Sequence, residues 1–306
     1  MTAAMWKAYL ASFIFGSGTA MGAVAFAAAL ELTGAEWAGP LRPMAERFRA
    51  FLPVSFVLYG VLLLGAPTIY PWMRQPSHSA WLQFGPFVWR DLGVLLGIYG
   101  AAVWFSRASA RARGSNVERS TSSGSPRARP SGDAAPATPA AVSFLIVYAA
   151  GFGILSVDLL MSLEPSWSST LFPAYFATAS LYAGIAAIVV AAAWTRPARE
   201  LMLNDARSRD LGNLFLGFAL LWMYLVWSQY LVLWYGNVTE DVGYVIHRFE
   251  GGWRTIVWMV IAARFIVPFL GFLTRAGKHP RPVTIIGAVS LAGFWLECYL
   301  LVAPSR

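Results

Sequence analysis

Eight apolar runs, each of about twenty residues, limit what this chain can fold into. They centre on residues 8–30, 51–70, 89–106, 141–163, 171–194, 211–235, 253–273 and 283–303. A helix of about 20 apolar residues crosses the roughly 30 Å hydrocarbon core of a bilayer and satisfies its own backbone hydrogen bonds there. The first run is too long for the apolar part of a cleaved signal peptide, so we count it as a span. The sequence therefore predicts an all-α integral membrane protein with about eight transmembrane helices.

Charge supports a membrane setting and predicts an orientation. Only 12% of the 306 residues are charged, whereas soluble domains have roughly a quarter. The net charge is +8, and most of the basic residues lie in alternate connections between the runs. These residues are Arg42, Arg47, Arg49, Arg107, Arg111, Arg113, Arg119, Arg127, Arg129, Arg196, Arg199, Arg207, Arg209, Arg275, Lys278 and Arg281. The positive-inside rule places these connections in the cytoplasm and both termini in the periplasm. We therefore attribute the basic excess to membrane topology and expect no nucleic-acid partner.

The order of the runs predicts two halves. Four runs precede the sequence SLEPSW and four follow it, so we expect two four-helix bundles over residues 1–163 and 164–306. Residues 107–140 are rich in Ser, Arg, Pro and Gly, which predicts a disordered cytoplasmic linker inside the first half. Small residues such as Gly18 and Gly22, spaced four apart, predict close helix packing, as do Ser180 and Gly184 in the fifth run.

Ligands for redox cofactors are scarce. Cys298 is the single cysteine, so one chain can form neither a disulfide nor a cysteine-held cluster. The three histidines, His78, His247 and His279, all fall in predicted loops, whereas axial ligands of haem b project from within helices. We therefore expect this chain to carry no cofactor or metal of its own and to borrow redox groups from partners.

Three charged residues lie well inside the apolar runs, beyond the first three residues of each run. Asp158 is about 8 Å from the outer end of its run, Glu297 lies at a similar depth in the last run, and Arg264 is near the middle of the seventh. Such residues are costly to insert and point to function or to pairing, and Arg264 could pair with either carboxylate. One interpretation is an ion pair that only locks the bundle. The other is a proton-conducting half-channel, or the polar wall of a quinone or ion site.

Two residues of the predicted outer loops extend this set. Glu164 follows Asp158 at the end of the fourth run, and Pro165 disfavours further helix there. His247 titrates near physiological pH and could relay protons, or it could be a surface histidine that contacts a partner. The candidate proton pathway is therefore Asp158, Glu164, Arg264 and Glu297, with His247 as an outer relay.

Four segments carry a resemblance to a known family. SVDLLMSLEPSWSSTLFPAYFATASLYAG, QYLVLWYGNVTED and GGWR follow one another in the second half, and LTGAEWAGPLRPMAERFRAFLPVSFVLYG precedes them. Together they resemble NrfD or polysulfide-reductase-type membrane subunits. The similarity is greatest to the second, smaller NrfD-like subunit of alternative complex III, a bacterial quinol:cytochrome c oxidoreductase.

The resemblance implies partners and a location. It implies two four-helix bundles in the bacterial cytoplasmic membrane, beside a paralogous NrfD-like subunit that holds the quinol site. A periplasmic iron–sulfur subunit and cytochrome c subunits with haem c would complete the electron-transfer complex. Asp158 and Glu164 match the family's acidic D-x-x-M-S-L-x-P pattern, which the resemblance associates with proton translocation.

Two other functions remain open from the residues. A secondary transporter could use Asp158, Arg264 and Glu297 at the interface between the halves, because transporters place polar sites there. A structural scaffold subunit would tolerate neutralisation of all three residues without loss of quinol oxidation.

Overall fold

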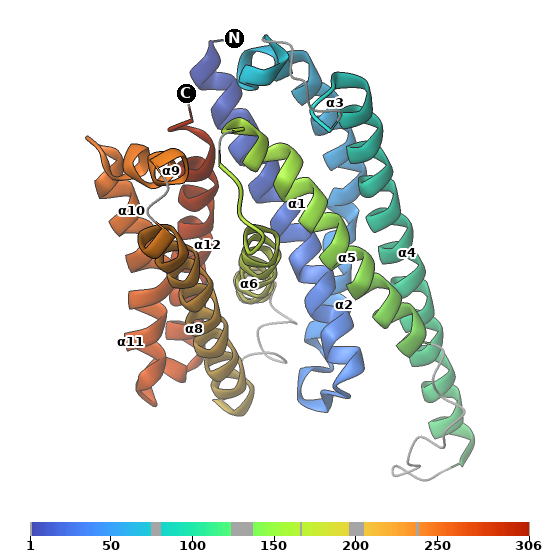
Figure 1. Ribbon diagram of the computed structural model, residues 1–306. Helices are drawn as coiled ribbons and strands as arrows, with labels where there is room; N and C mark the ends of the chain where they lie inside the picture. The colour runs from blue at the N-terminus through green and yellow to red at the C-terminus, as the bar shows by residue number, and fades with distance from the viewer. Residues whose placement is uncertain are drawn as a thin grey trace.

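The computed structural model describes residues 2–74, 81–123, 137–165, 167–195, 205–236 and 239–305, with side chains described for all of these except 36, 115–123 and 239–241. Within these ranges the regular secondary structure is entirely helical (Figure 1). The α-helices are α1 (Ala3–Leu32), α2 (Leu41–Arg47), α3 (Leu52–Ile69), α4 (Phe84–Ser123), α5 (Ala137–Leu159), α6 (Phe172–Trp194), α8 (Asp205–Gly236), α9 (Thr239–Phe249), α10 (Trp253–Ile261), α11 (Val267–Leu273) and α12 (Pro280–Val302).

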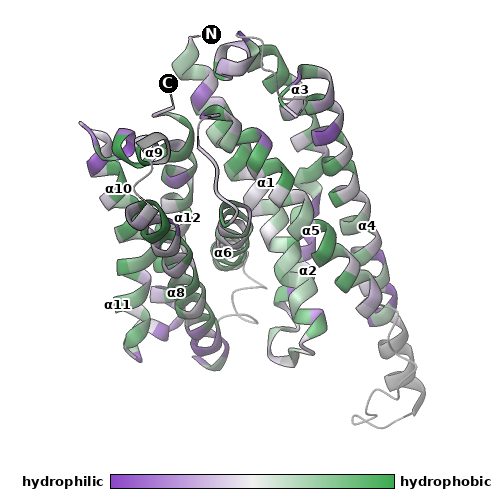
Figure 2. Cartoon of the chain, viewed as in Figure 1, coloured by the Kyte–Doolittle hydropathy of each residue, from purple (hydrophilic) through white to green (hydrophobic). Residues whose placement is uncertain are grey.

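The described helices confirm the predicted all-α, multi-span membrane fold. Eight of them, counted with α2 joined to α3 and α10 joined to α11, are long and apolar enough to cross a membrane. Apolar residues cover most of their length, and hydrophilic residues gather toward the helix ends (Figure 2). The two termini lie at the same end of the helix assembly, as an even number of spans requires (Figure 1).

Proline marks where several spans begin. Pro53, Pro173 and Pro280 occupy the first turn of α3, α6 and α12. A proline is favoured there because the first amides of a helix have no partner within the helix, so its missing N–H costs nothing. These positions therefore explain why the apolar runs become separate helices and do not merge through their connections.

Helices α1 and α6 form the centre of the fold. Of the most apolar stretch of each span, 83% is buried in α1 and 67% in α6, but only 17% in α8. Helix α1 packs on α3 and α5, α6 packs on α8 and α12, and α1 and α6 pack on each other. The division into bundles at residue 163 stays a prediction, since α5 also contacts α6 across that boundary.

Two glycines allow the backbones of α1 and α6 to touch. A Cβ atom on Gly22 would lie 1.9 Å from the carbonyl oxygen of Ser180, and one on Gly184 would lie 2.1 Å from the backbone nitrogen of Ala23. Neither atom belongs to a flexible side chain, so no small adjustment would make room. The small residues noticed in the sequence therefore serve packing within one chain, as glycines do in close membrane helix pairs.

The predicted linker is ordered at both of its ends, which corrects the sequence interpretation. Helix α4 continues from the apolar run through Ser123, and α5 already begins at Ala137. The composition of 107–123 was misleading because it also contains Ala and Arg, which favour helix. Residues 124–136, the remainder of the predicted linker, lie outside the described residues.

A cluster of charges holds the extended part of α4 in place. Arg113 donates two hydrogen bonds of 2.8 Å to the Glu46 carboxylate on α2, and Ser109 donates to the same carboxylate at 2.6 Å. Arg42 bridges this group to Glu31 at the end of α1. Glu46 is only 4% exposed, so these donors satisfy a carboxylate that would otherwise be buried without partners.

Candidate functional site

The first group of polar residues surrounds Asp158 on the last turn of α5. Asp158 is fully buried, and each of its carboxylate oxygens accepts a hydrogen bond. Arg90 Nε of α4 donates at 2.5 Å, and Trp81 Nε1 of the segment before α4 donates at 2.8 Å. The Arg90 guanidinium also lies over the Trp81 ring, 3.9 Å from its centroid. Asp158 therefore points inward, as the sequence predicts, and its charge is balanced by a neighbouring helix.

A second carboxyl group that the sequence interpretation missed lies beside Asp158. Asp91 follows Arg90 in α4, is fully buried, and accepts a hydrogen bond of 3.0 Å from the hydroxyl of Tyr59 on α3. The sequence gives little signal for Asp91, because a charged pair near the start of a span is also typical of the membrane interface. The signal that could have found it is its place inside the third apolar run, 89–106, where a carboxyl group is costly to insert.

A second buried centre forms around Glu297 on α12. Glu297 is 2% exposed and Arg264 is fully buried, with 3.0 Å between Arg264 Nε and Glu297 Oε2. Trp222 Nε1 of α8 donates to Glu297 Oε1 at 2.8 Å, and the hydroxyl of Tyr175 on α6 donates to the same oxygen. Four helical segments thus meet at one carboxylate in the second half of the chain.

The backbone around Arg264 departs from the α-helix. Residues Ala262–Ile266 form a π-helical turn between α10 and α11, and such turns occur frequently at functional sites. The Arg264 guanidinium donates to the carbonyl of Ala179 at 3.1 Å and lies 4.5 Å from the centroid of the Tyr182 ring. Its Nη1 has no hydrogen-bond partner among the described residues. The guanidinium is therefore held by an ion pair, one carbonyl and an aromatic face.

Glu164 belongs to a third group at the end of the molecule that carries the termini. Arg248 Nη1 on α9 lies 3.2 Å from Glu164 Oε1, and Arg248 Nη2 donates to the carbonyl of Leu301 at 3.0 Å. Tyr244 is stacked between Arg248, 3.5 Å from its ring centroid, and Trp167, 3.7 Å away. Burial raises the pKa of Tyr244, although the Arg248 guanidinium opposes the rise and the Glu164 carboxylate adds to it. This group fastens α9 and the loop after α5 to the end of α12.

The predicted residues therefore fall into separate groups. Of the two possible partners of Arg264, the structure selects Glu297, whereas Asp158 pairs with Arg90. His247 lies on helix α9 and not in the loop that the sequence predicts, and its buried Nδ1 has no hydrogen-bond partner in the described ranges. His279 precedes α12, as expected for a connection, and His78 lies outside the described residues.

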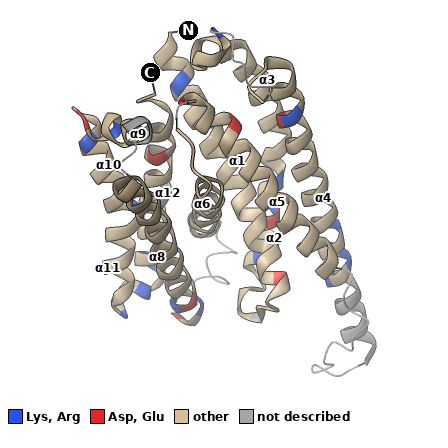
Figure 3. Ribbon diagram, in the orientation of Figure 1, with Lys and Arg blue, Asp and Glu red and all other residues tan. Residues whose placement is uncertain are grey.

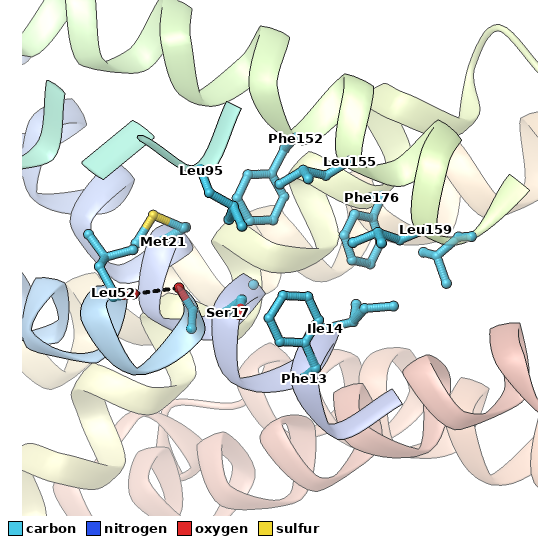
Figure 4. A pocket seen from close by; sticks show the side chains of 13 residues that line it. Phe13, Ile14, Ser17, Met21, Leu52, Leu95, Phe152, Leu155, Leu159 and Phe176 are labelled. Carbon is cyan, nitrogen blue, oxygen red and sulfur yellow. Dashed lines mark hydrogen bonds between the residues drawn. The ribbon is translucent and has the colours of Figure 1, made fainter. Parts of the chain in front are cut away.

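An apolar cavity lies among α1, α3, α4, α5 and α6 (Figure 4). Its volume of about 20 Å³ is sufficient for about one water molecule. Leu159 and Phe176, which line it, adjoin Asp158 and Tyr175 in the sequence, but no residue of either polar centre lines the cavity itself. Ser17 is among the few polar lining residues and its hydroxyl has no hydrogen-bond partner in the described part of the chain. No chain of described polar side chains therefore links the Asp158 group directly to the Glu297 group through this cavity.

The opposite end of the molecule is rich in positive charge. Lys and Arg gather at the lower ends of α4, α8 and α11, away from the termini (Figure 3). Lys278 donates to Asn213 at 2.7 Å, and Arg207 donates to the carbonyl of Trp37 at 3.0 Å. The described residues contain no group of three or more His, Cys, Asp or Glu side chains arranged to hold a metal ion.

The fold and its buried ionisable groups define the class of protein as a multi-pass, all-α membrane protein. No protein-family model matches the chain, and the comparison with curated proteins finds no significant match.

Proposed function

We propose that this chain is an integral-membrane subunit of a quinol-oxidising electron-transfer complex of the alternative complex III kind. In that complex it supports assembly and the surroundings of the quinone site, and its buried carboxylates take part in proton translocation. The redox groups, iron–sulfur clusters and haem c, are carried by partner subunits, and the quinol site lies in a paralogous NrfD-like subunit. The sequence segments that resemble NrfD-type subunits support the kind of complex.

The observation that carries the proton-moving role is the burial of carboxylates in both halves of the chain. Asp158 is fully buried and Glu297 is 2% exposed, each beside one arginine. Removing ions from water costs several kcal/mol each, and well-packed apolar residues often stabilise a protein as well as a buried ion pair does. Ionisable residues at membrane depth therefore favour function over scaffolding, and a carboxyl group is a side chain that can carry a proton.

The positive charge at one end supports an orientation. Loops with excess Lys and Arg favour the cytoplasmic side of a membrane, so the lower ends of α4, α8 and α11 in Figure 3 are proposed to face the cytoplasm. The termini, Glu164 and α9 then face the periplasm of a bacterial cytoplasmic membrane. This side is where the proposed iron–sulfur and cytochrome c partners dock and where protons from quinol oxidation are released.

Purification tests the assembly. The chain is tagged in its native host and isolated in mild detergent, and haem and iron are then measured in the eluate. We expect haem c and iron–sulfur clusters to be recovered together with the chain. Recovery of the chain alone, without either redox group, contradicts the proposal.

Proton release tests the role of the carboxylates. The purified complex is reconstituted in vesicles, and protons released per quinol oxidised are measured for Glu297→Gln and Asp158→Asn. Both amides keep the size of the side chain, and Glu250→Gln, on an exposed residue, is the matched control. We expect fewer protons per quinol in the two buried variants and no change in the control. An unchanged ratio in both buried variants supports the structural scaffold instead.

A secondary transporter is the second candidate, and the π-helical turn at Arg264 favours it. Transporters bind solutes near interrupted helices in the membrane. Uptake of a solute or ion by vesicles that contain this chain alone, and its loss in Arg264→Gln, would support this function over membership of a redox complex.

A further inference from the structure

Two fully buried carboxyl groups adjoin each other in the first half of the chain. Asp91 on α4 and Asp158 on α5 are both fully buried, and their side chains are within hydrogen-bonding reach of each other. An ionised carboxylate only accepts hydrogen bonds, so two ionised groups in this arrangement have no donor between them.

The other donors near the pair leave one oxygen unsatisfied. Trp81 and Arg90 donate to the two oxygens of Asp158, and Tyr59 donates to Oδ2 of Asp91. Oδ1 of Asp91 is buried and has no hydrogen-bond partner among the described residues. Leaving a buried acceptor without a donor is costly. The simplest explanation is that a proton lies at this oxygen.

The charges around the pair lead to the same conclusion. Among the described residues, the titratable and charged groups that face the pair are Tyr59 on α3, Tyr70 directly after α3, and Arg90 on α4. Arg90 is the single cation among them within the described residues, and it pairs with Asp158. Two ionised carboxylates would therefore leave one negative charge buried beside another, which strongly disfavours ionisation of both.

We propose that Asp91 and Asp158 hold one exchangeable proton between their carboxyl groups, so that α4 and α5 together form a proton-binding site. The proton supplies the donor that Oδ1 of Asp91 lacks, and it leaves one negative charge opposite Arg90. Because the two carboxyls share the proton, they act together as one proton-binding site. This inference deepens the proton-moving part of the proposed function and rests on it for its biological purpose.

Infrared spectroscopy of the full-length purified chain tests the site. Aspartate is labelled with carbon-13, and the C=O stretch of protonated carboxyl groups is recorded near pH 7 in H₂O and in D₂O. Exposed aspartates, with an ordinary pKa of about 3.9, are ionised under these conditions and do not contribute. We expect one labelled band that moves in D₂O and disappears in both Asp91→Asn and Asp158→Asn, because either change leaves one carboxylate beside Arg90.

Controls separate a shared proton from loss of the fold. Asp210→Asn, on an exposed residue, is expected to leave the band unchanged. Tyr59→Phe keeps both carboxyls but removes the hydrogen bond to Oδ2 of Asp91, so the band is expected to remain and to shift to higher frequency. Absence of the band in the wild-type chain, or full intensity in Asp91→Asn, overturns the proposal. Because the isolated chain is measured, this result is independent of co-purification and proton release, which test the proposed function.

Discussion

Replacement of Arg264 by methionine tests whether the Glu297 centre behaves as a buried ion pair. With 3.0 Å between Arg264 Nε and Glu297 Oε2, the attraction of two unit charges is about 5.5 kcal/mol at an effective dielectric constant of about 20. The cost of removing both charges from water offsets much of this attraction. Removal of one partner still leaves an unbalanced buried charge, so Arg264→Met is expected to lower the free energy of unfolding by about 3–5 kcal/mol.

The double variant distinguishes an ion pair from simple packing. Arg264→Met combined with Glu297→Met removes both charges and keeps apolar volume, so its stability is expected to lie near that of the wild type. The free energy of unfolding is measured in detergent by reversible denaturation for the wild type, both single variants and the double variant. If the effects of the two single variants add within about 0.5 kcal/mol, the residues do not interact energetically and our interpretation of the centre is wrong.

Three further changes test the packing and the polar contacts at the helix ends. Gly184→Ala places a Cβ atom 2.1 Å from a backbone nitrogen of α1, so we expect the free energy of unfolding, measured by thermal denaturation, to fall by about 3 kcal/mol. The control Gly217→Ala has open space around it and is expected to be neutral or stabilising. Arg113→Gln removes the bidentate contact to the Glu46 carboxylate on α2. We expect faster amide hydrogen exchange in the last turns of α4, equivalent to a loss of about 1–3 kcal/mol in local stability. Unchanged exchange would contradict that anchoring role. Arg248→Met removes the ion pair between Glu164 and α9, so we expect proteases to cleave next to Glu164 faster than they do in the wild type.

The sequence was sufficient to predict the transmembrane helices, because about twenty consecutive apolar residues identify a span whatever it packs against. It was insufficient for the continuation of α4 beyond the third apolar run, since Ser109 and Arg113 are hydrogen-bonded to Glu46, which lies more than sixty residues earlier. Composition alone assigns those residues to a disordered cytoplasmic linker. Only the packing of α2 against α4 shows that Ser109 and Arg113 have a buried carboxylate, Glu46, as their partner.

The same distinction applies to the candidate site. Burial of Asp158 and Glu297 was predictable because an ionisable side chain in an apolar run has nowhere favourable to point except inward. The choice of partner was not predictable, because Arg264 lies on a different helix from both carboxylates and only helix packing selects Glu297. Asp91 was missed for a related reason, since its significance depends on the end of α5 approaching the start of α4.

The contact between Gly22 and Gly184 also restricts how this protein can move. A rocker-switch carrier exposes its substrate to each side in turn by tilting one half of the molecule about the other, which requires side chains at the pivot that can roll past one another. Here main-chain atoms of α1 and α6 meet directly, so tilting would drive backbone into backbone. This rigid contact between α1 and α6 is compatible with proton transfer between groups at fixed positions. It disfavours a transport mechanism in which one half of the molecule tilts against the other.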